Sequence, residues 1–104
     1  MTYKFNGARY MTNGINSQLS LELQLILWGM IAENIKKGLK MDYLQVFDLK
    51  LIHIDGVRMQ EITHRQEQPK RQNTFAFESD KPINAKIFVI DDIDHVTMLF
   101  NHEY

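Results

Sequence analysis

The sequence predicts an α+β fold in which a mostly antiparallel sheet of about five to six strands packs on one main apolar helix. Two observations support this prediction. Residues 19–39 form a leucine-rich segment of helical composition, and residues 43–100 hold short runs of β-branched and aromatic residues separated by turn signals. The 104 residues lie within the size range of one domain, so we expect a single domain over residues 1–104. The expected order of elements is β-α-β-β-β-β-β.

The main helix is predicted from residues 19–39. Its leucines first alternate as in a strand, but Leu, Glu and Gln favour helix, and the apolar pattern continues through Trp28. Ser17 or Ser20 can cap the start of the helix, and Gly38 follows its basic last turn. A short strand at residues 9–12 and a turn at Asn13-Gly14 are expected before it.

Apolar side chains cover more than half of the helical wheel drawn for this segment. An amphipathic surface helix needs an apolar stripe only about 100° wide. The helix must therefore be covered on more than one side, either by the sheet and loops of the same chain or by a second protein molecule. We take Leu21, Leu25 and Trp28 as candidate interface residues.

A long hairpin is predicted from residues 43–54 and 57–66, which flank the turn pair Asp55-Gly56. Apolar residues fall on both faces of the first strand. Either the strand changes phase at Val46-Phe47, or both of its faces are partly buried.

The C-terminal part predicts a loop and three strands. Residues 68–73 are polar and typical of a loop, residues 74–77 suit a short strand, and residues 86–90 and 95–100 suit a second hairpin around the acidic turn 91–94. A five-stranded, partly closed barrel remains an alternative to the two-layer arrangement.

Composition excludes several classes of protein. The absence of cysteine rules out disulfides, thiolate zinc sites and cysteine nucleophiles. The net charge of -1 names no partner. The first residues lack the apolar stretch of a signal peptide, and the longest run without a polar side chain, residues 25–32, is too short to span a bilayer. From the sequence we expect a soluble, cytoplasmic protein.

No motif nominates a reaction or a cofactor. The glycines are scattered, so no phosphate-binding loop is formed, and HExxH and GxSxG are absent. The turn 91–94 beside His95 fails the calcium-loop pattern, and a solvated turn is the favoured interpretation, so we predict no metal site. His64 near Glu67 suggests a general base, yet a solvated strand end accounts for both residues.

Residues 64–73 carry three cations against one carboxylate, with Phe75 and Phe77 just beyond. Cations that hold phosphates beside aromatic rings that stack on bases are typical of nucleic-acid surfaces, whereas an ordinary polar loop followed by core phenylalanines is the simpler interpretation. The candidate binding residues of this segment are His64, Arg65, Glu67, Lys70 and Arg71.

Several stretches together resemble one known family. They are RYMTNGI (residues 9–15), LELQLILW (21–28), DYLQVFDL (42–49), HRQE (64–67) and FVIDD (88–92). They are similar to the small Firmicutes proteins of the staphylococcal family "domain of unknown function nine-sixty", some copies of which lie on mobile elements. The resemblance implies an intracellular bacterial context and an accessory role near DNA transactions, but no activity and no site residues.

The sequence therefore favours a non-enzymatic accessory or protein-interaction protein, with a homodimer through the apolar helix as its simplest form. A nucleic-acid-binding accessory using the basic segment 64–73 is the alternative, and a small enzyme centred on His64 and Glu67 is the third hypothesis.

Overall fold

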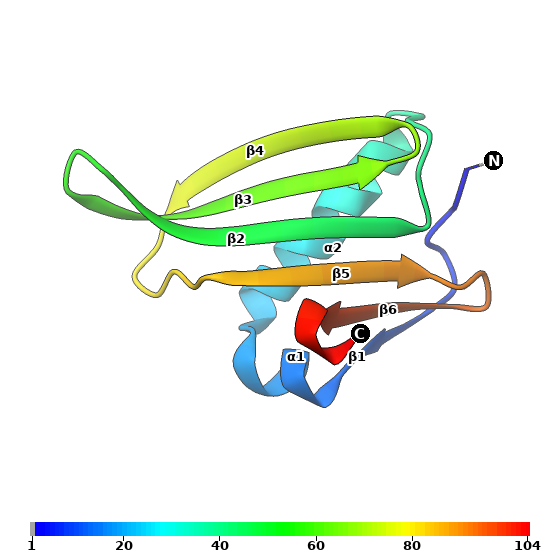
Figure 1. Cartoon of the computed structure of the whole chain (residues 1–104), viewed down its shortest axis with the longest axis horizontal. Helices are drawn as coiled ribbons and strands as arrows, with labels where there is room; N and C mark the ends of the chain where they lie inside the picture. Colours follow the sequence, from blue (N-terminus) through cyan, green and yellow to red (C-terminus); the bar gives the residue numbers. More distant parts are fainter. Residues whose placement is uncertain (1) are drawn as a thin grey trace.

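The computed structural model describes residues 2–104 and shows one sheet with a long helix lying diagonally across one of its faces (Figure 1). In chain order the elements are β1 (Ala8–Met11), α1 (Asn13–Gln18), α2 (Leu21–Lys36), β2 (Leu44–Ile54), β3 (Val57–Glu67), β4 (Lys70–Glu78), β5 (Ala85–Asp91), β6 (His95–Phe100) and the 3-10 turn η1 (Asn101–Glu103). The predicted combination of a mostly β domain with one main helix is confirmed.

The order of the six strands in the sheet is β1-β6-β5-β2-β3-β4. Four pairs are antiparallel, but β1 pairs with β6 in parallel, so the sheet is mixed. The predicted element order is also wrong in one respect, because α1 stands where a turn at Asn13-Gly14 was expected. Thr12 caps this helix by accepting a hydrogen bond from the backbone N–H of Ile15, 3.2 Å away, and the Ile15 side chain is fully buried.

Helix α2 lies between two residues that the sequence indicated as its limits, Ser20 and Gly38. The Ser20 hydroxyl accepts a hydrogen bond from the backbone N–H of Leu23, and Gly38 adopts a φ of 76° just after the last turn. The helix is shorter than the predicted range 19–39 because its ends are set by these two residues. The side chains that α2 buries are those of Leu23, Gln24, Leu27, Trp28, Ile31 and Asn34.

Both faces of strand β2 are partly buried, as one of the two sequence interpretations requires, and the buried residues lie in the first half of the strand. Its pairing with β3 runs without interruption from Val46↔Arg65 to Ile54↔Val57, so the phase does not change. Phe47 faces α2 and is fully buried, whereas Val46 is buried on the opposite face of the sheet. The hairpin turn has positive φ at both Asp55 and Gly56, as predicted for this pair.

The polar loop predicted over residues 68–73 does not exist. Only Gln68 and Pro69 connect β3 to β4, and β4 continues from Lys70 to Glu78 in register with β3. The prediction failed because β4 lies at the edge of the sheet and none of its residues is buried, so both faces of its first half contact solvent. Its first half therefore carries no apolar alternation.

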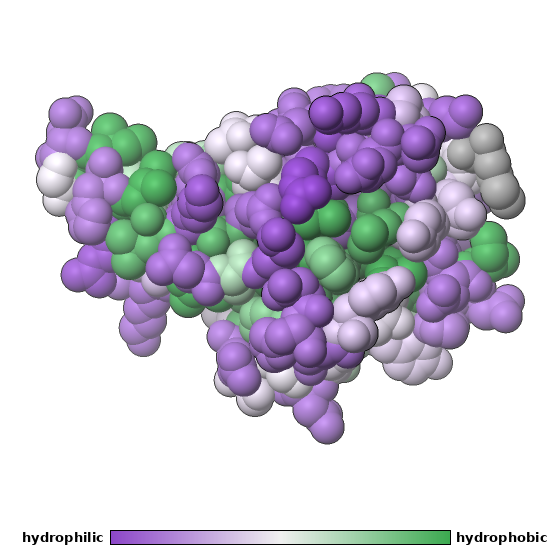
Figure 2. Space-filling view, viewed as in Figure 1, coloured by the Kyte–Doolittle hydropathy of each residue, from purple (hydrophilic) through white to green (hydrophobic). Residues whose placement is uncertain are grey.

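The face of the sheet opposite α2 is shown in Figure 2. Apolar side chains gather at the protruding tip of the β2–β3 hairpin, where Ile54 and Val57 are 48% and 41% exposed. A polar band crosses the sheet behind the tip. On this face of the sheet Asp48 forms ion pairs with Arg65, at 2.9 Å, and with Lys86, at 3.9 Å.

Two carboxylates hold the segments near the two ends of the described chain against the rest of the fold. Asp91 accepts hydrogen bonds from the backbone N–H groups of Phe5 and Ile93. Glu103 accepts from the backbone N–H of Phe100 and from the hydroxyl of Thr12. These contacts lower the pKa of Glu103, with the Phe100 bond as the largest cause.

Candidate interaction surface

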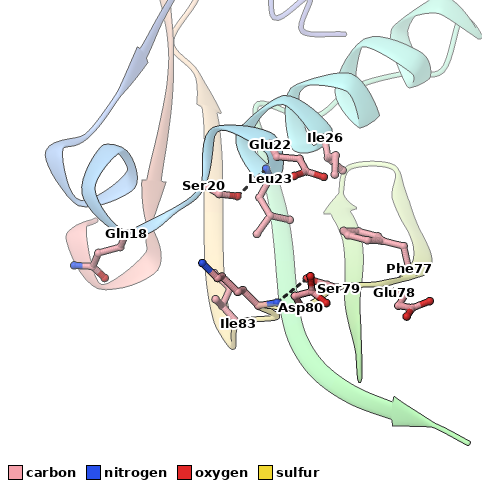
Figure 3. A pocket seen from close by; sticks show the side chains of 11 residues that line it. Gln18, Ser20, Glu22, Leu23, Ile26, Phe77, Glu78, Ser79, Asp80 and Ile83 are labelled. Carbon is pink, nitrogen blue, oxygen red and sulfur yellow. Dashed lines mark hydrogen bonds between the residues drawn. The ribbon is translucent and has the colours of Figure 1, made fainter. Parts of the chain in front are cut away.

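A groove runs between α2 and β4. Its wider part is a cavity of about 550 Å³ at the start of α2, where Leu23 points down from the helix and Phe77 points across from β4 (Figure 3). The connection after β4 closes this end with Ser79 and Ile83. The remaining lining residues include Ser20, Glu22, Ile26, Glu78, Asp80 and Lys81.

The groove continues along α2 beyond Ile26. A second cavity of about 220 Å³ is lined by Gly29 and Met30 of the helix and by Asn73 and Phe75 of β4. Ile26 lines both cavities, which lie one after the other between α2 and β4, and we call the two together the α2–β4 groove.

Alternation along β4 explains which side chains reach the groove. Residues directly opposite one another in an antiparallel pair share a face of the sheet. Asn73 lies opposite His64 and Phe77 lies opposite Gln60, both of which are buried beneath α2. Residues 71, 73, 75 and 77 therefore face the helix side, and Phe75 stays 54% exposed there because α2 does not extend over it.

The outer edge of β4 pairs with no strand among residues 2–104, since β4 ends the strand order. Natural edge strands are blunted by charged side chains, proline, bulges or short length. Residues 72–77 of β4 read QNTFAF and hold none of these charged or proline residues. The other edge strand, β1, is only 4 residues long.

The two ends of β4 differ in charge. At its start lie Lys70, Arg71 and Lys40, and the Arg71 guanidinium donates to the backbone carbonyl of Lys40 at 2.7 Å. At its end, Glu78 and Asp80 border the wide cavity, together with Glu22 from α2 and a single cation, Lys81. The edge therefore runs from a basic end to a predominantly acidic end.

A buried polar network lies beneath the narrow end of the groove. His64 Nε2 donates to Gln45 Oε1 at 2.7 Å, and Gln45 Nε2 donates to Gln66 Oε1 at 2.9 Å. Gln66 donates in turn to the carbonyls of Lys40 and Pro69. Sequence reasoning missed both glutamines. Gln60, Ile62, His64 and Gln66 alternate along one face of β3, but three of these four side chains are polar, so the pattern gave no sign that this face is buried.

The chemistry of His64 is limited by its surroundings. The ring stacks on Phe47 with centroids 4.3 Å apart and planes 16° apart. Burial, and next the positive charge of Arg71, lower the pKa of His64 to about 4. The imidazole is therefore neutral at neutral pH and serves as a hydrogen-bond donor to Gln45.

The comparisons with known proteins identify a family. The family model described as "Staphylococcal protein of unknown function (DUF960)" matches residues 8–103. The chain belongs to this family. A solved structure, described as the protein of unknown function from Enterococcus faecalis, is 25% identical to this chain with a TM-score of 0.78, over 100% of this chain and 98% of that one. None of the curated proteins matches.

In this member of the family, His64 and Glu67 do not form a joint site. His64 faces α2 and is buried, whereas Glu67, three residues further along the same strand, points to the opposite face and is exposed. The expectation of a solvated strand end is wrong for His64 and correct for Glu67.

The cations of segment 64–73 are split between the two faces of the sheet, because successive side chains of a strand point to opposite faces. Arg65 lies on the open face and pairs with Asp48, whereas Arg71 lies on the helix side and binds the Lys40 carbonyl. Lys70 is exposed at the first position of β4. Lys70 lies opposite Glu67 and so shares the open face with Arg65, while Arg71 is separated from both on the helix side.

The three candidate interface residues of α2 differ in their exposure to solvent. Trp28 is buried, with the Arg9 guanidinium 4.6 Å above its ring, while Leu21 and Leu25 are 68% and 60% exposed. The requirement that α2 be covered on several sides is thus met at Trp28 by the chain itself but not at the two leucines.

The acidic turn contains one unexpectedly buried residue, Asp91, which binds two backbone N–H groups, while Asp92 pairs with His95 at 3.3 Å. Over residues 2–104, no group of three or more histidine and acidic side chains is placed to hold a metal ion. Within the same residues, no helix is long and apolar enough to cross a membrane.

Proposed function

We propose that this protein is a non-enzymatic protein-interaction domain that binds an extended chain segment along β4. In this mode the incoming segment adds a strand to the sheet. Main-chain hydrogen bonds supply affinity, and pockets for alternate side chains supply specificity.

The observation that carries this proposal is the unpaired nine-residue edge of β4 beside the α2–β4 groove. An added strand would find free backbone groups along β4 and would place every second side chain against Phe75, Phe77 and Ile26. The rest of the sheet and α2 form a rigid support for such a site.

The composition of β4 also supports this function. Long edges without protective charges or proline promote uncontrolled pairing, so they persist where a partner covers them. The uncharged run 72–77 and the exposed Phe75 ring match an edge that is covered during function.

The test is selection of peptides from a random nonapeptide library displayed on phage, with the protein held at a concentration where it is monomeric. Enriched peptides should protect β4 amides from hydrogen exchange. They should lose affinity for Phe75→Lys, which places a charge in the groove.

The matched control is Leu25→Lys, because Leu25 is exposed on α2 and is not a lining residue of the groove. This variant should bind the peptides as the unmodified chain does. Failure to enrich any peptide, or enriched peptides that tolerate Phe75→Lys, would show that β4 is not an interaction edge.

A further inference from the structure

We infer that the segment bound along β4 is the β4 strand of a second copy of this chain, in an antiparallel arrangement centred on Thr74. This inference rests on the proposed function of the β4 edge and names its partner. The resulting twofold dimer joins two six-stranded sheets into one continuous sheet, with both α2 helices on the same face.

The charges of β4 are self-complementary in this arrangement. An antiparallel pair centred on Thr74 places Lys70 opposite the partner's Glu78, and the twofold axis repeats this contact at the other end. Among residues 2–104, neither Lys70 nor Glu78 forms an ion pair within the chain. Lys70 lies opposite Glu67 in the β3–β4 register without forming an ion pair, and a second copy would bring an opposite charge to the free side of both Lys70 and Glu78.

The surroundings of the edge carry the same complementarity. The start of β4 lies beside Lys40 and Arg71, with Glu67 as an acidic neighbour opposite Lys70. Its end lies beside Glu22 and Asp80 at the wide cavity, with Lys81 and Arg58 as the basic neighbours, so each end carries an excess of one sign of charge. Twofold symmetry brings the basic end of one copy against the acidic end of the other. A parallel arrangement would oppose like charges at both ends, so antiparallel pairing is favoured.

The uncharged middle of the strand fits a contact between copies. On the helix side, Phe75 lies opposite the partner's Asn73 and diagonal to the partner's Phe75, a spacing that aromatic side chains can bridge. On the other face, the Thr74 hydroxyl, which lies 3.1 Å from that of Thr63, would meet the partner's Thr74. The exposed Phe75 ring thus becomes covered at the centre of the interface.

The test measures the molar mass by sedimentation velocity from low micromolar to about 1 mM chain, the weak end of the usual affinity range. Hydrogen exchange is recorded at both ends of this range. We expect a concentration-dependent dimer and protection of amides in residues 70–78. Residues 8–11 of the other edge strand should show no change.

Charge reversal tests the register. Lys70→Glu or Glu78→Lys alone should raise the dimer dissociation constant roughly tenfold, because each replaces two symmetry-related attractions by repulsions. The double variant with both changes restores opposite charges at both ends and should dimerise like the unmodified chain. Lys50→Glu, an exposed change on β2 away from the edge, is the control.

A chain that stays monomeric at about 1 mM overturns the inference, as does a dimer that leaves β4 unprotected or that fails to regain affinity in the double variant. Each of these results leaves strand addition at β4 open to the peptide selection. If peptides also fail to bind β4, the proposed function itself is wrong.

Discussion

His64 donates a hydrogen bond of 2.7 Å to Gln45 across the β2–β3 pair while its ring stacks on Phe47. This arrangement keeps a titratable ring uncharged inside the sheet. Because burial opposes protonation, the folded state binds a proton at His64 less readily than the unfolded state does.

The first prediction concerns acid stability. The pKa of His64 falls from 6.5 to about 4 on folding, so unfolded chains bind more protons between these values. The free energy of unfolding that neutral His64 contributes is fully present above about pH 6.5 and is lost as the pH falls toward about 4. The total loss amounts to about 3 kcal/mol at most. Urea unfolding at several pH values measures this slope. His64→Gln should flatten it, and an unchanged slope in that variant would assign the acid sensitivity to other groups.

The second prediction concerns Trp28. Its indole is 6% exposed beneath the Arg9 guanidinium. Trp28→Ala should lower the free energy of unfolding by about 3–5 kcal/mol because a large cavity is left. Trp28→Phe, which keeps an aromatic face for Arg9, should cost less. Equal losses in the two variants, measured by denaturant unfolding, would contradict this account.

The third prediction concerns Gly29, which lies inside α2 and faces open space, so that a methyl group added there would contact no neighbouring element within 4 Å. Gly29→Ala should stabilise the protein by about 0.4–1 kcal/mol, because alanine restricts the unfolded chain and favours helix. Gly56→Ala should instead destabilise it by about 1–2 kcal/mol. The reason is that Gly56 has a φ of 79° in the hairpin turn. Thermal unfolding of the two variants should shift in opposite directions.

The fourth prediction concerns Asp91. Its carboxylate accepts hydrogen bonds from the Phe5 and Ile93 N–H groups at 2.9 and 2.8 Å. Asp91→Ala should cost about 2–4 kcal/mol, since two donors lose a charged acceptor. In the same variant, the hydrogen-exchange rate of the Phe5 amide should rise. Asp92→Ala, which removes only an exposed ion pair, should stay within about 0.5 kcal/mol. Similar costs for the two variants would mean that Asp91 does not hold the N-terminal segment.

The fifth prediction separates two interfaces. Leu21→Lys and Leu25→Lys change exposed side chains of α2, so each should alter stability by no more than about 0.5 kcal/mol. If copies associate through β4, both variants should retain the dimer seen by sedimentation. Loss of the dimer in these variants, with stability retained, would assign the interface to the apolar face of α2 instead.

Elements with strong local signals were predictable from the sequence. Ser20 and Gly38 delimit α2 through capping and positive φ, and Asp55-Gly56 sets the register of the β2–β3 hairpin. These signals act between residues close in sequence, so no knowledge of the tertiary structure is needed to use them.

Features that depend on distant partners were not predictable. The parallel pairing of β1 depends on β6, and the full extent of β4 depends on its backbone pairing with β3 rather than on its side chains. Gln45 and Gln66 have polar side chains that indicate exposure, yet both are buried because each satisfies the other and His64. The candidate groove arises from the angle at which α2 crosses the sheet, which no local pattern encodes.

The parallel pair of β1 and β6 has a consequence for synthesis on the ribosome. Residues 8–11 leave the exit tunnel long before their pairing partner, residues 95–100. Until that partner emerges, the first strand has no strand to pair with, and the Arg9 guanidinium above the Trp28 ring is not held in place. Completion of the native structure must therefore follow translation of the last strand. Nascent chains that stall before residue 95 should expose apolar surface to chaperones.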